Sequence, residues 1–354
     1  MRGPFRPLIA CLLATFLVVL IAGVASAQEE ESSAQSQRSI VGPGESIQRA
    51  VNAAEPGDTI LVRGIHRETV LIRKDGITLV GDEAVLVPPD RQTSPCGPAG
   101  FCLLGEVNFQ TGEVSEYVED VSIIGFTVRN FREFGIVAIG ARDAKFVKNR
   151  AFNNGEYGIT SFFSTGTKVL SNVTSGAEDA AIYVGDSPHA NTRIANNDTY
   201  DSASGILVRN SLHGQIIANK AHNNCVGIIF IADAPGPAGE FEVDGNTVQH
   251  NNRACPATAE TPRLSGVGIG LLGARDIEIR ANHVLKNVPS GPPALSGGVV
   301  LVRGIEGTAP KNNSVVGNVI LRNHPDIFWD RSGSGNRFVG NECRTSRPGG
   351  LCEP

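Results

Sequence analysis

The sequence predicts an all-β chain that winds into a solenoid of short parallel strands. Three observations predict this fold class: asparagine recurs at intervals mostly of 23 or 24 residues, short apolar alternations recur at the same period, and the chain contains 41 glycines and 20 prolines. A period in the low twenties with strand-like alternation is typical of a β-solenoid, whereas a helical repeat would carry a period of about 3.6 residues. We expect about three short strands in each coil.

Asparagine ends eight segments that occupy equivalent positions, from FVKN to FVGN. Asparagine tolerates left-handed backbone geometry, and stacked amide side chains can hydrogen-bond one another along the stacking direction. The sequence therefore predicts one asparagine per coil, at a corner, in a ladder that runs through the solenoid. The residues predicted to form this ladder are Asn149, Asn172, Asn196, Asn219, Asn246, Asn282, Asn318 and Asn341.

A second series of small residues precedes a set of apolar strands. Coil register places an isoleucine inward after each small residue, as at Ile136, Ile159 and Ile182, and these side chains are the predicted core. The outward positions are also apolar, which is unusual for an exposed face and favours contact with a covering loop, a partner or sugar rings. The small residues are Gly135, Gly158, Ala181, Gly205 and Gly227, and the central outward residues are Val137, Thr160, Tyr183, Leu207 and Ile229.

The two ends of the chain carry distinct signals. Arg2 and Arg6 precede an apolar run that ends in Ala25-Ser26-Ala27, which is typical of a secretory signal peptide over residues 1–27. A membrane anchor is the alternative, but no other long apolar segment follows, so we expect a secreted, extracellular protein with no membrane span after cleavage. The remaining chain divides into a flexible linker over 28–39, a solenoid domain over 40–341 and a C-terminal tail over 342–354.

Six cysteines remain after the leader, an even number in a chain expected to reach an oxidising compartment. Six cysteines allow fifteen pairings. Proximity in sequence favours three short-range disulfides over a metal site, because no CxxC pair is present and no histidine stands at zinc-ligand spacing. The favoured pairs are Cys96 with Cys102, Cys225 with Cys255 and Cys343 with Cys352.

The formal net charge of the chain is −5, and the charges are spread along it. A nucleic-acid-binding protein needs a basic patch or stripe to neutralise phosphates. The sequence offers none, so nucleic acid is excluded as a partner.

These repeats resemble the right-handed parallel β-helix family, the pectate-lyase-like superfamily. The resemblance covers about residues 40 to 341 and includes the entry segment, where Glu45 to Ala54 form an amphipathic pattern with Ile47 and Val51 inward. It implies about ten coils with an N-terminal helix that caps the open end of the solenoid. It also implies a substrate cleft on the sheet formed by the strands that follow these small residues. The outward positions of that sheet contain only one charged residue, Arg209.

Candidate catalytic side chains lie in the turn that follows these strands on two adjacent coils. Asp186 and Arg209 lie on adjacent coils and could pair, His189 and His213 follow in the same two turns, and Tyr183 precedes them. The segment DSPH resembles the Asp-Pro-His element of mannuronan epimerases and alginate-active β-helices, an imperfect match because a serine intervenes. The resemblance implies proton abstraction beside a uronate carboxylate, with Arg209 neutralising charge and His189 or Tyr183 as base or acid. An ordinary Asp-Ser-Pro turn is the alternative.

Metal sites are the remaining question for the sequence. Glu156, Glu178, Asp179 and Asp201 recur near coil spacing, and stacked carboxylates could bind Ca²⁺, with solvation on exposed turns as the alternative. Some proteins of this fold carry a copper-related description. Met1 is the only methionine here and the histidines are scattered, so the sequence offers no soft-ligand cluster for copper.

Two classes of function remain open. The first is an enzyme, a polysaccharide lyase or epimerase, that acts on uronate-containing polysaccharide by β-elimination or C5 epimerisation. The second is a non-catalytic carbohydrate-binding or surface interaction protein that uses the apolar outward stripe. Both predict a polysaccharide or cell-surface glycan as the partner, and the poverty of charge on the outward columns favours the second class.

Overall fold

The computed structural model describes residues 37–91, 94–233, 236–257 and 263–352. The predicted signal peptide and all but the last three residues of the predicted linker lie outside these ranges. Among the described residues, no helix is long and apolar enough to cross a membrane. The described chain consists of one short helix and 35 strands, nearly all parallel, which confirms the predicted all-β solenoid.

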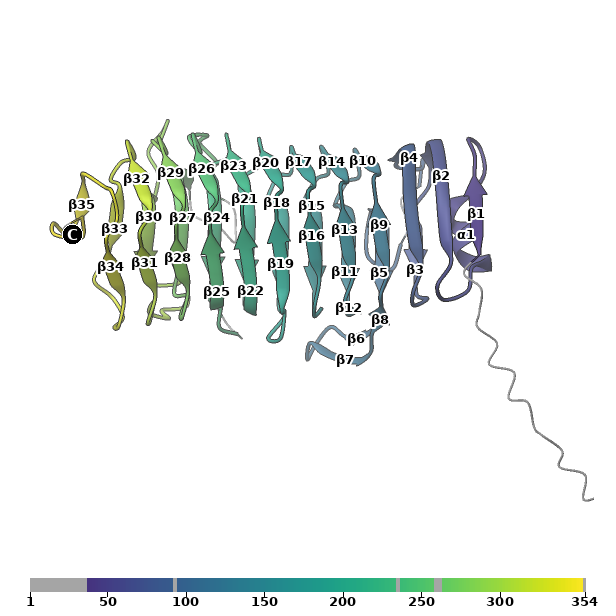
Figure 1. Cartoon of the computed structure of the whole chain (residues 1–354), viewed down its shortest axis with the longest axis horizontal. Coiled ribbons are helices and arrows are strands. Elements are labelled where there is room, and N and C mark those ends of the chain that lie inside the picture. The colour runs from purple at the N-terminus through teal and green to yellow at the C-terminus, as the bar shows by residue number, and fades with distance from the viewer. Residues whose placement is uncertain (1–36, 92–93, 234–235, 258–262, 353–354) are drawn as a thin grey trace, which may run out of the picture. The chain divides into compact units, whose positions relative to one another are not determined.

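Successive coils contribute strands to three parallel sheets, and each strand pairs with its counterparts one coil before and one coil after (Figure 1). The long strands β2 and β4 bend at a coil corner, so they join sheets II and III at the N-terminal end. Sheet I consists of β3 (Val70–Ile72), β5 (Ala99–Leu104), β11 (Phe134–Ile139), β15 (Tyr157–Phe162), β18 (Ala180–Gly185), β21 (Ser204–Arg209), β24 (Val226–Ile231), β27 (Leu264–Leu272), β30 (Leu295–Val302), β33 (Ile327–Trp329) and β35 (Ser346–Arg347).

Sheet II consists of β1 (Arg38–Val41), β2 (Thr59–Arg67), β4 (Thr78–Val87), β9 (Ser122–Ile124), β13 (Lys145–Val147), β16 (Lys168–Leu170), β19 (Thr192–Ala195), β22 (Leu212–Ile217), β25 (Gly239–Asp244), β28 (Glu278–Arg280), β31 (Ser314–Val316) and β34 (Arg337–Val339). Sheet III consists of β10 (Thr127–Arg129), β14 (Arg150–Phe152), β17 (Val173–Ser175), β20 (Asp198–Tyr200), β23 (Lys220–His222), β26 (Thr247–Gln249), β29 (His283–Leu285) and β32 (Val319–Leu321). Two small pairs stand apart: the antiparallel hairpin β6 (Glu106–Asn108) and β7 (Glu113–Glu116), and the parallel pair β8 (Val118–Glu119) and β12 (Ala141–Arg142).

The inward side chains of the three sheets form one continuous core. Ile136, Ile159 and Ile182, predicted to point inward, are fully buried in it. The small residues before these strands are required by coil stacking: a Cβ at Gly135 would lie 2.5 Å from the carbonyl oxygen of Gly158 in the next coil. The sequence therefore predicted the core, and the structure adds the reason for the glycine series.

The asparagine ladder is present, with one correction. Asn197, and not the predicted Asn196, is the rung between Asn172 and Asn219, because its Oδ1 accepts from the Asn172 Nδ2 at 3.0 Å and its Nδ2 donates to the Asn219 Oδ1 at 2.9 Å. Asn196 is exposed and holds the left-handed position, with φ of 58°. The left-handed residue and the buried amide are thus two adjacent positions, and the two asparagines in sequence concealed which was which.

Two further ladders stabilise the other corners. Asn224, Asn251 and Asn287 stack with amide-to-amide distances of 3.0 and 2.9 Å. At the corner after sheet I, the Ser187 Oγ accepts from the Ser164 amide, and the Ser211 Oγ accepts from the Ser187 amide, each at 3.1 Å. Ser187, the residue that interrupts the Asp-Pro-His resemblance, is therefore a structural rung.

Both ends of the described solenoid are capped. Helix α1 (Ile47–Ala53) buries Ile47 and Val51 at the N-terminal end, as predicted, and the Ser46 Oγ caps it by accepting from the Arg49 amide. At the other end β35 adds a last strand within the segment predicted as a tail, and Trp329 packs against the end of the core. The three predicted disulfides are confirmed: Cys96–Cys102, Cys225–Cys255 and Cys343–Cys352.

Candidate functional site

The outward face of sheet I is sealed along most of its length. The exposed fraction is 3% for Tyr183, 4% for Leu207 and 2% for Ile229, although all three point away from the core. Aromatic stacking is one cause: the Tyr183 ring lies 4.4 Å from the Tyr157 ring and 5.1 Å from the Phe162 ring, between centroids. The apolar stripe seen in the sequence is therefore a second hydrophobic cluster, and it forms no open catalytic groove at these positions.

Tyr183 lies beside charged groups at the end of its strand. Its ring folds over Gly185, where a Cβ would come within 2.2 Å of the phenol oxygen. Burial, followed by the negative charge of Asp186, raises the pKa of the Tyr183 phenol far above its usual value. Burial and the carboxylate of Asp179, which accepts the hydroxyl hydrogen bond at 3.1 Å, do the same to Tyr157. A phenol of this kind stays protonated, so it can donate a proton or a hydrogen bond but cannot serve as a base near neutral pH.

Arg209 forms an ion pair with Asp233 of the following coil, with the Nη2 atom 2.7 Å from Oδ2 and the Nε atom 3.0 Å from the same oxygen. Asp186 accepts a 3.4 Å hydrogen bond from the Asn210 amide, and burial raises its pKa against the opposing effects of that bond and of Arg209. Asp233 is not among the site residues predicted from the sequence. Its place 24 residues after Arg209 in the coil period was the signal that could have found it.

His189 and His213 form a separate pair. Their rings stack in parallel at 6.3 Å between centroids, and the His213 Nδ1 lies 2.9 Å from the Glu240 carboxylate. Among the described residues, neither ring forms a hydrogen bond or ion pair with Tyr183, Asp186 or Arg209. The five predicted catalytic residues therefore divide into two groups. One is a cluster at the end of the sheet I strands, where Tyr183 is buried and Asp186 and Arg209 are half-buried. The other is a pair of imidazoles, with His189 exposed at the corner and His213 half-buried in β22.

The four predicted calcium ligands do not assemble into a metal site. Asp179 is engaged with Tyr157, and the backbone amides of Glu178 and Asp179 bond to carbonyl groups of the preceding coil. Within the part of the chain that the structure describes, no group of three or more His, Cys, Asp or Glu side chains could hold a metal ion. The prediction of Ca²⁺ at Glu156, Glu178, Asp179 and Asp201 therefore receives no support.

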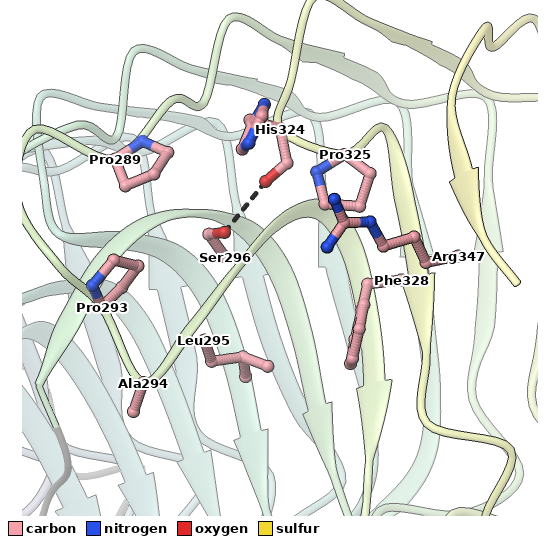
Figure 2. A pocket seen from close by; sticks show the side chains of 9 residues that line it. All are labelled: Pro289, Pro293, Ala294, Leu295, Ser296, His324, Pro325, Phe328 and Arg347. Carbon is pink, nitrogen blue, oxygen red and sulfur yellow. Dashed lines mark hydrogen bonds between the residues drawn. The ribbon is translucent and has the colours of Figure 1, made fainter.

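The outward column of sheet I opens at its C-terminal end. Register carries the central position from Tyr183 through Leu207 and Ile229 to Val300, which is fully buried, and then to Phe328 and Arg347. A pocket of about 350 Å³ lies there (Figure 2). Its lining consists of Pro289, Pro293, Ala294, Leu295, Ser296, His324, Pro325, Phe328 and Arg347.

Sequence reasoning missed this pocket. The outward column predicted from the sequence ends at Ile229, and the residues that line the pocket come from three separate segments beyond it. Proline-rich residues of the loop before β30 form one wall, and Phe328 and Arg347 form the opposite wall (Figure 2). The sequence signal that was available is the outward column itself, extended across the last two coils to Phe328 and Arg347.

A second hollow, of about 460 Å³, lies at the N-terminal cap and is already occupied by structural contacts. Glu68 accepts from the Ile47 amide at 2.7 Å and from the Ser46 hydroxyl at 2.9 Å. The two ring nitrogens of His66 each lie 3.0 Å from a backbone carbonyl oxygen. These groups hold the capping helix in place, so the pocket at Phe328 is the better candidate for a ligand site.

A family model described as periplasmic copper-binding protein (NosD) matches residues 52–252, more than half of the chain. The chain belongs to the NosD family. A second model, described as right handed beta helix region, matches residues 188–352 and agrees with the predicted handedness of this NosD-family solenoid. Among curated proteins, no sequence matches the chain.

Solved structures share the fold of this NosD-family chain at low identity. The mannuronan C-5 epimerase AlgE4 A-module of Azotobacter vinelandii is 17% identical with a TM-score of 0.59, over 84% of this chain and 90% of that one. The periplasmic alginate epimerase AlgG is 14% identical with a TM-score of 0.52, over 86% and 84%. The Dettilon tailspike protein is 15% identical with a TM-score of 0.58, over 87% and 68%.

The donor set of this NosD-family chain does not fit copper. Copper sites draw on thiolate, thioether and imidazole ligands. All six cysteines after residue 27 are closed in disulfides, and the one methionine, Met1, lies outside the described residues. The described histidines and carboxylates form no group of three that could bind a metal ion. The family description therefore does not extend to a copper site built from the described residues, whereas its periplasmic part agrees with three disulfides formed in an oxidising compartment.

Proposed function

We propose that this protein binds a polysaccharide or a cell-surface glycan, without transforming it, after export from the cytoplasm. The observation that carries the proposal is the pocket at the end of sheet I. It joins a half-buried aromatic ring, Phe328, with polar groups of His324, Ser296 and Arg347 around about 350 Å³ of open space. Sugar-binding sites combine an apolar platform with a few hydrogen-bonding groups, and this volume lies within the usual range for small-ligand sites.

Two further observations support binding over catalysis. The outward face that would carry a catalytic cleft is sealed at Tyr183, and the phenol there is held protonated. The structures of similar fold named above include a mannuronan C-5 epimerase and an alginate epimerase, which supports a glycan as the ligand class. Similarity of fold suggests only the class of ligand, and the pocket at Phe328 is the proposed binding site.

The experiment measures binding of the exported chain, residues 28–354, to immobilised alginate, pectate and dextran by affinity electrophoresis. Phe328→Ala should weaken binding at least tenfold, because the platform for the sugar ring is lost. Phe109→Ala is the matched control, since Phe109 is an exposed aromatic on the β6–β7 hairpin outside the pocket, and it should leave binding unchanged. Equal binding by the two variants contradicts the proposal.

A second candidate is uronate chemistry by β-elimination or C5 epimerisation at the sheet I cluster. The raised pKa of Asp186 beside Arg209 and Asn210 is the observation that favours it, because burial makes this carboxylate a stronger proton acceptor than an exposed one. Tyr183 would act as the acid, Asp186 or His189 as the base and Arg209 as the partner of the substrate carboxylate, with His213 beside His189.

Turnover on pectate, alginate and heparinoid substrates, with and without Ca²⁺, tests this second candidate. Unsaturated product and exchange of the C5 proton are followed. Turnover that disappears in His189→Ala or Asp186→Asn would replace the binding proposal, whereas no signal, or equal signal from both variants, removes this mechanism.

A further inference from the structure

Arg347 has no carboxylate partner among the described residues, unlike the arginines that form ion pairs on the outer faces of the solenoid. Arg209 lies 2.7 Å from Asp233, Arg275 lies 2.6 Å from Glu240, and Arg63 lies 2.8 Å from Asp82. Within the described part of the chain, the Arg347 guanidinium has no ion-pair or hydrogen-bond partner. An unpaired guanidinium at a pocket wall is a ready donor for an anionic ligand, because no internal carboxylate must first be displaced.

The rest of the pocket wall has the same electrostatic character. The His324 ring also has no hydrogen-bond partner among the described residues, and only its backbone carbonyl is used, as acceptor for the Ser296 hydroxyl at 2.9 Å (Figure 2). The lining includes no aspartate and no glutamate. The pocket lining therefore contains an arginine and an imidazole but no carboxylate, which favours a negatively charged ligand.

The placement of Arg347 relative to Phe328 sets the shape of that ligand. The two residues are paired neighbours on β33 and β35, so their backbones lie one strand spacing apart, roughly 4.8 Å, and both side chains line the pocket. A sugar ring packed on Phe328 would thus occupy the same pocket as the planar fork of Arg347. A carboxylate matches that fork with two parallel hydrogen bonds.

We infer that this pocket selects hexuronate residues, with Phe328 as the platform for the sugar ring and Arg347 as the anchor for its carboxylate. The inference rests on the proposed glycan-binding function and adds the ligand class and the residue that decides it. Arg347 is the specificity-determining group, and Phe328 contributes equally to acidic and neutral sugars.

Isothermal titration calorimetry of the exported chain with tri-galacturonate, trimannuronate and neutral mannotriose tests the inference. The two uronates should bind at least tenfold more tightly than mannotriose at low salt, and the difference should shrink between about 0.05 and 0.5 M NaCl as the ionic contact is screened. Arg347→Gln should weaken uronate binding at least tenfold and leave mannotriose within about twofold. Arg344→Gln is the matched control, because Arg344 is exposed in the same segment but does not line the pocket, and it should change neither.

The outcomes separate the inference from the function on which it rests. Equal binding of uronates and mannotriose, unaffected by Arg347→Gln, overturns the inference while glycan binding stands. No binding of any of the three sugars overturns both. Arg347→Lys keeps the charge but not the fork, so full uronate affinity in that variant refutes two-point recognition. Tighter binding of a sulfated trisaccharide than of tri-galacturonate assigns the pocket to sulfate esters and also refutes the inference. Far-UV circular dichroism and the unfolding midpoint confirm that each variant is folded.

Discussion

The corrected rung of the asparagine ladder gives the sharpest test of the structure. In Asn197→Ala, two buried groups lose the hydrogen bond from or to the Asn197 side chain: the Asn172 backbone N–H, whose bond measures 2.8 Å, and the Val169 carbonyl oxygen. The Asn172 side-chain amide also loses its bond to Asn197 and keeps only the one to the Phe146 carbonyl oxygen. The Asn219 Oδ1 keeps its bond from the Asn197 backbone amide at 2.9 Å. An unsatisfied buried group costs about 1–3 kcal/mol. We therefore expect the free energy of unfolding to fall by roughly 3–6 kcal/mol. Relaxation of the coil and entry of water should keep the loss below the largest total that these per-group costs would give.

The matched variant is Asn196→Gly. Asn196 is exposed and has a φ of 58°, a geometry that glycine adopts freely, so the free energy of unfolding should change by less than about 0.5 kcal/mol. Urea unfolding followed by far-UV circular dichroism measures both variants, with an unchanged m-value as the check on the comparison. Hydrogen exchange adds a local readout, because the Asn172 amide should lose its protection only in Asn197→Ala. A loss below about 1 kcal/mol in Asn197→Ala, or an equal loss in Asn196→Gly, refutes the assigned register.

Three further predictions follow from the disulfides, the buried phenols and the metal donor set. In the chain-entropy model, removal of Cys225–Cys255, which spans 30 residues, should lower the free energy of unfolding by about 3–4 kcal/mol. Removal of Cys96–Cys102, which spans 6 residues, should lower it by about 2 kcal/mol. Urea unfolding of the two double Cys→Ser variants measures both losses, and the reverse order contradicts the prediction. Above pH 10 the unfolded chain releases the phenol protons of Tyr157 and Tyr183 while the folded chain keeps them. Between pH 10 and 11 the free energy of unfolding should therefore fall by about 1 kcal/mol for each phenol, and Tyr183→Phe should halve the fall that the two phenols cause. An undiminished fall in Tyr183→Phe, measured by urea unfolding between pH 10 and 11, would show that this phenol titrates in the folded state. Calorimetric titration should show no stoichiometric Cu(I), Cu(II) or Ca²⁺ site with a Kd below about 1 μM. Stoichiometric copper binding that is lost in the His189→Ala, His213→Ala double variant would refute the conclusion that the donor groups do not fit copper.

Most of the fold could be predicted from local sequence patterns. A coil repeats the same corner and the same inward position at nearly constant spacing, so Ile136, Ile159 and Ile182 were identifiable as core without any knowledge of long-range contacts. The three disulfides were also accessible, since each joins cysteines that are near in sequence. Helix α1 followed from the amphipathic spacing of Ile47 and Val51.

Only part of the candidate site could be predicted from the sequence. The passage from Tyr183 to His189 carries the right residue types, but local spacing cannot show which side chains meet across coils. The structure joins Arg209 to Asp233 and His213 to Glu240, and both partners lie in a neighbouring coil. Two adjacent asparagines at 196 and 197 raise the same difficulty, because a shift of one residue exchanges an exposed corner for a buried rung.

The sequence by itself determined the solenoid, its core and its disulfides, because these depend on a period and on neighbours along the chain. Tertiary structure alone decided which surfaces are open. The outward apolar stripe is sealed where stacked aromatic side chains cover it at Tyr183, and it opens where the column ends at Phe328 and Arg347. Exposure depends on packing between segments far apart in sequence, here the proline-rich loop before β30 and the last two coils, and no periodicity within a single coil records it.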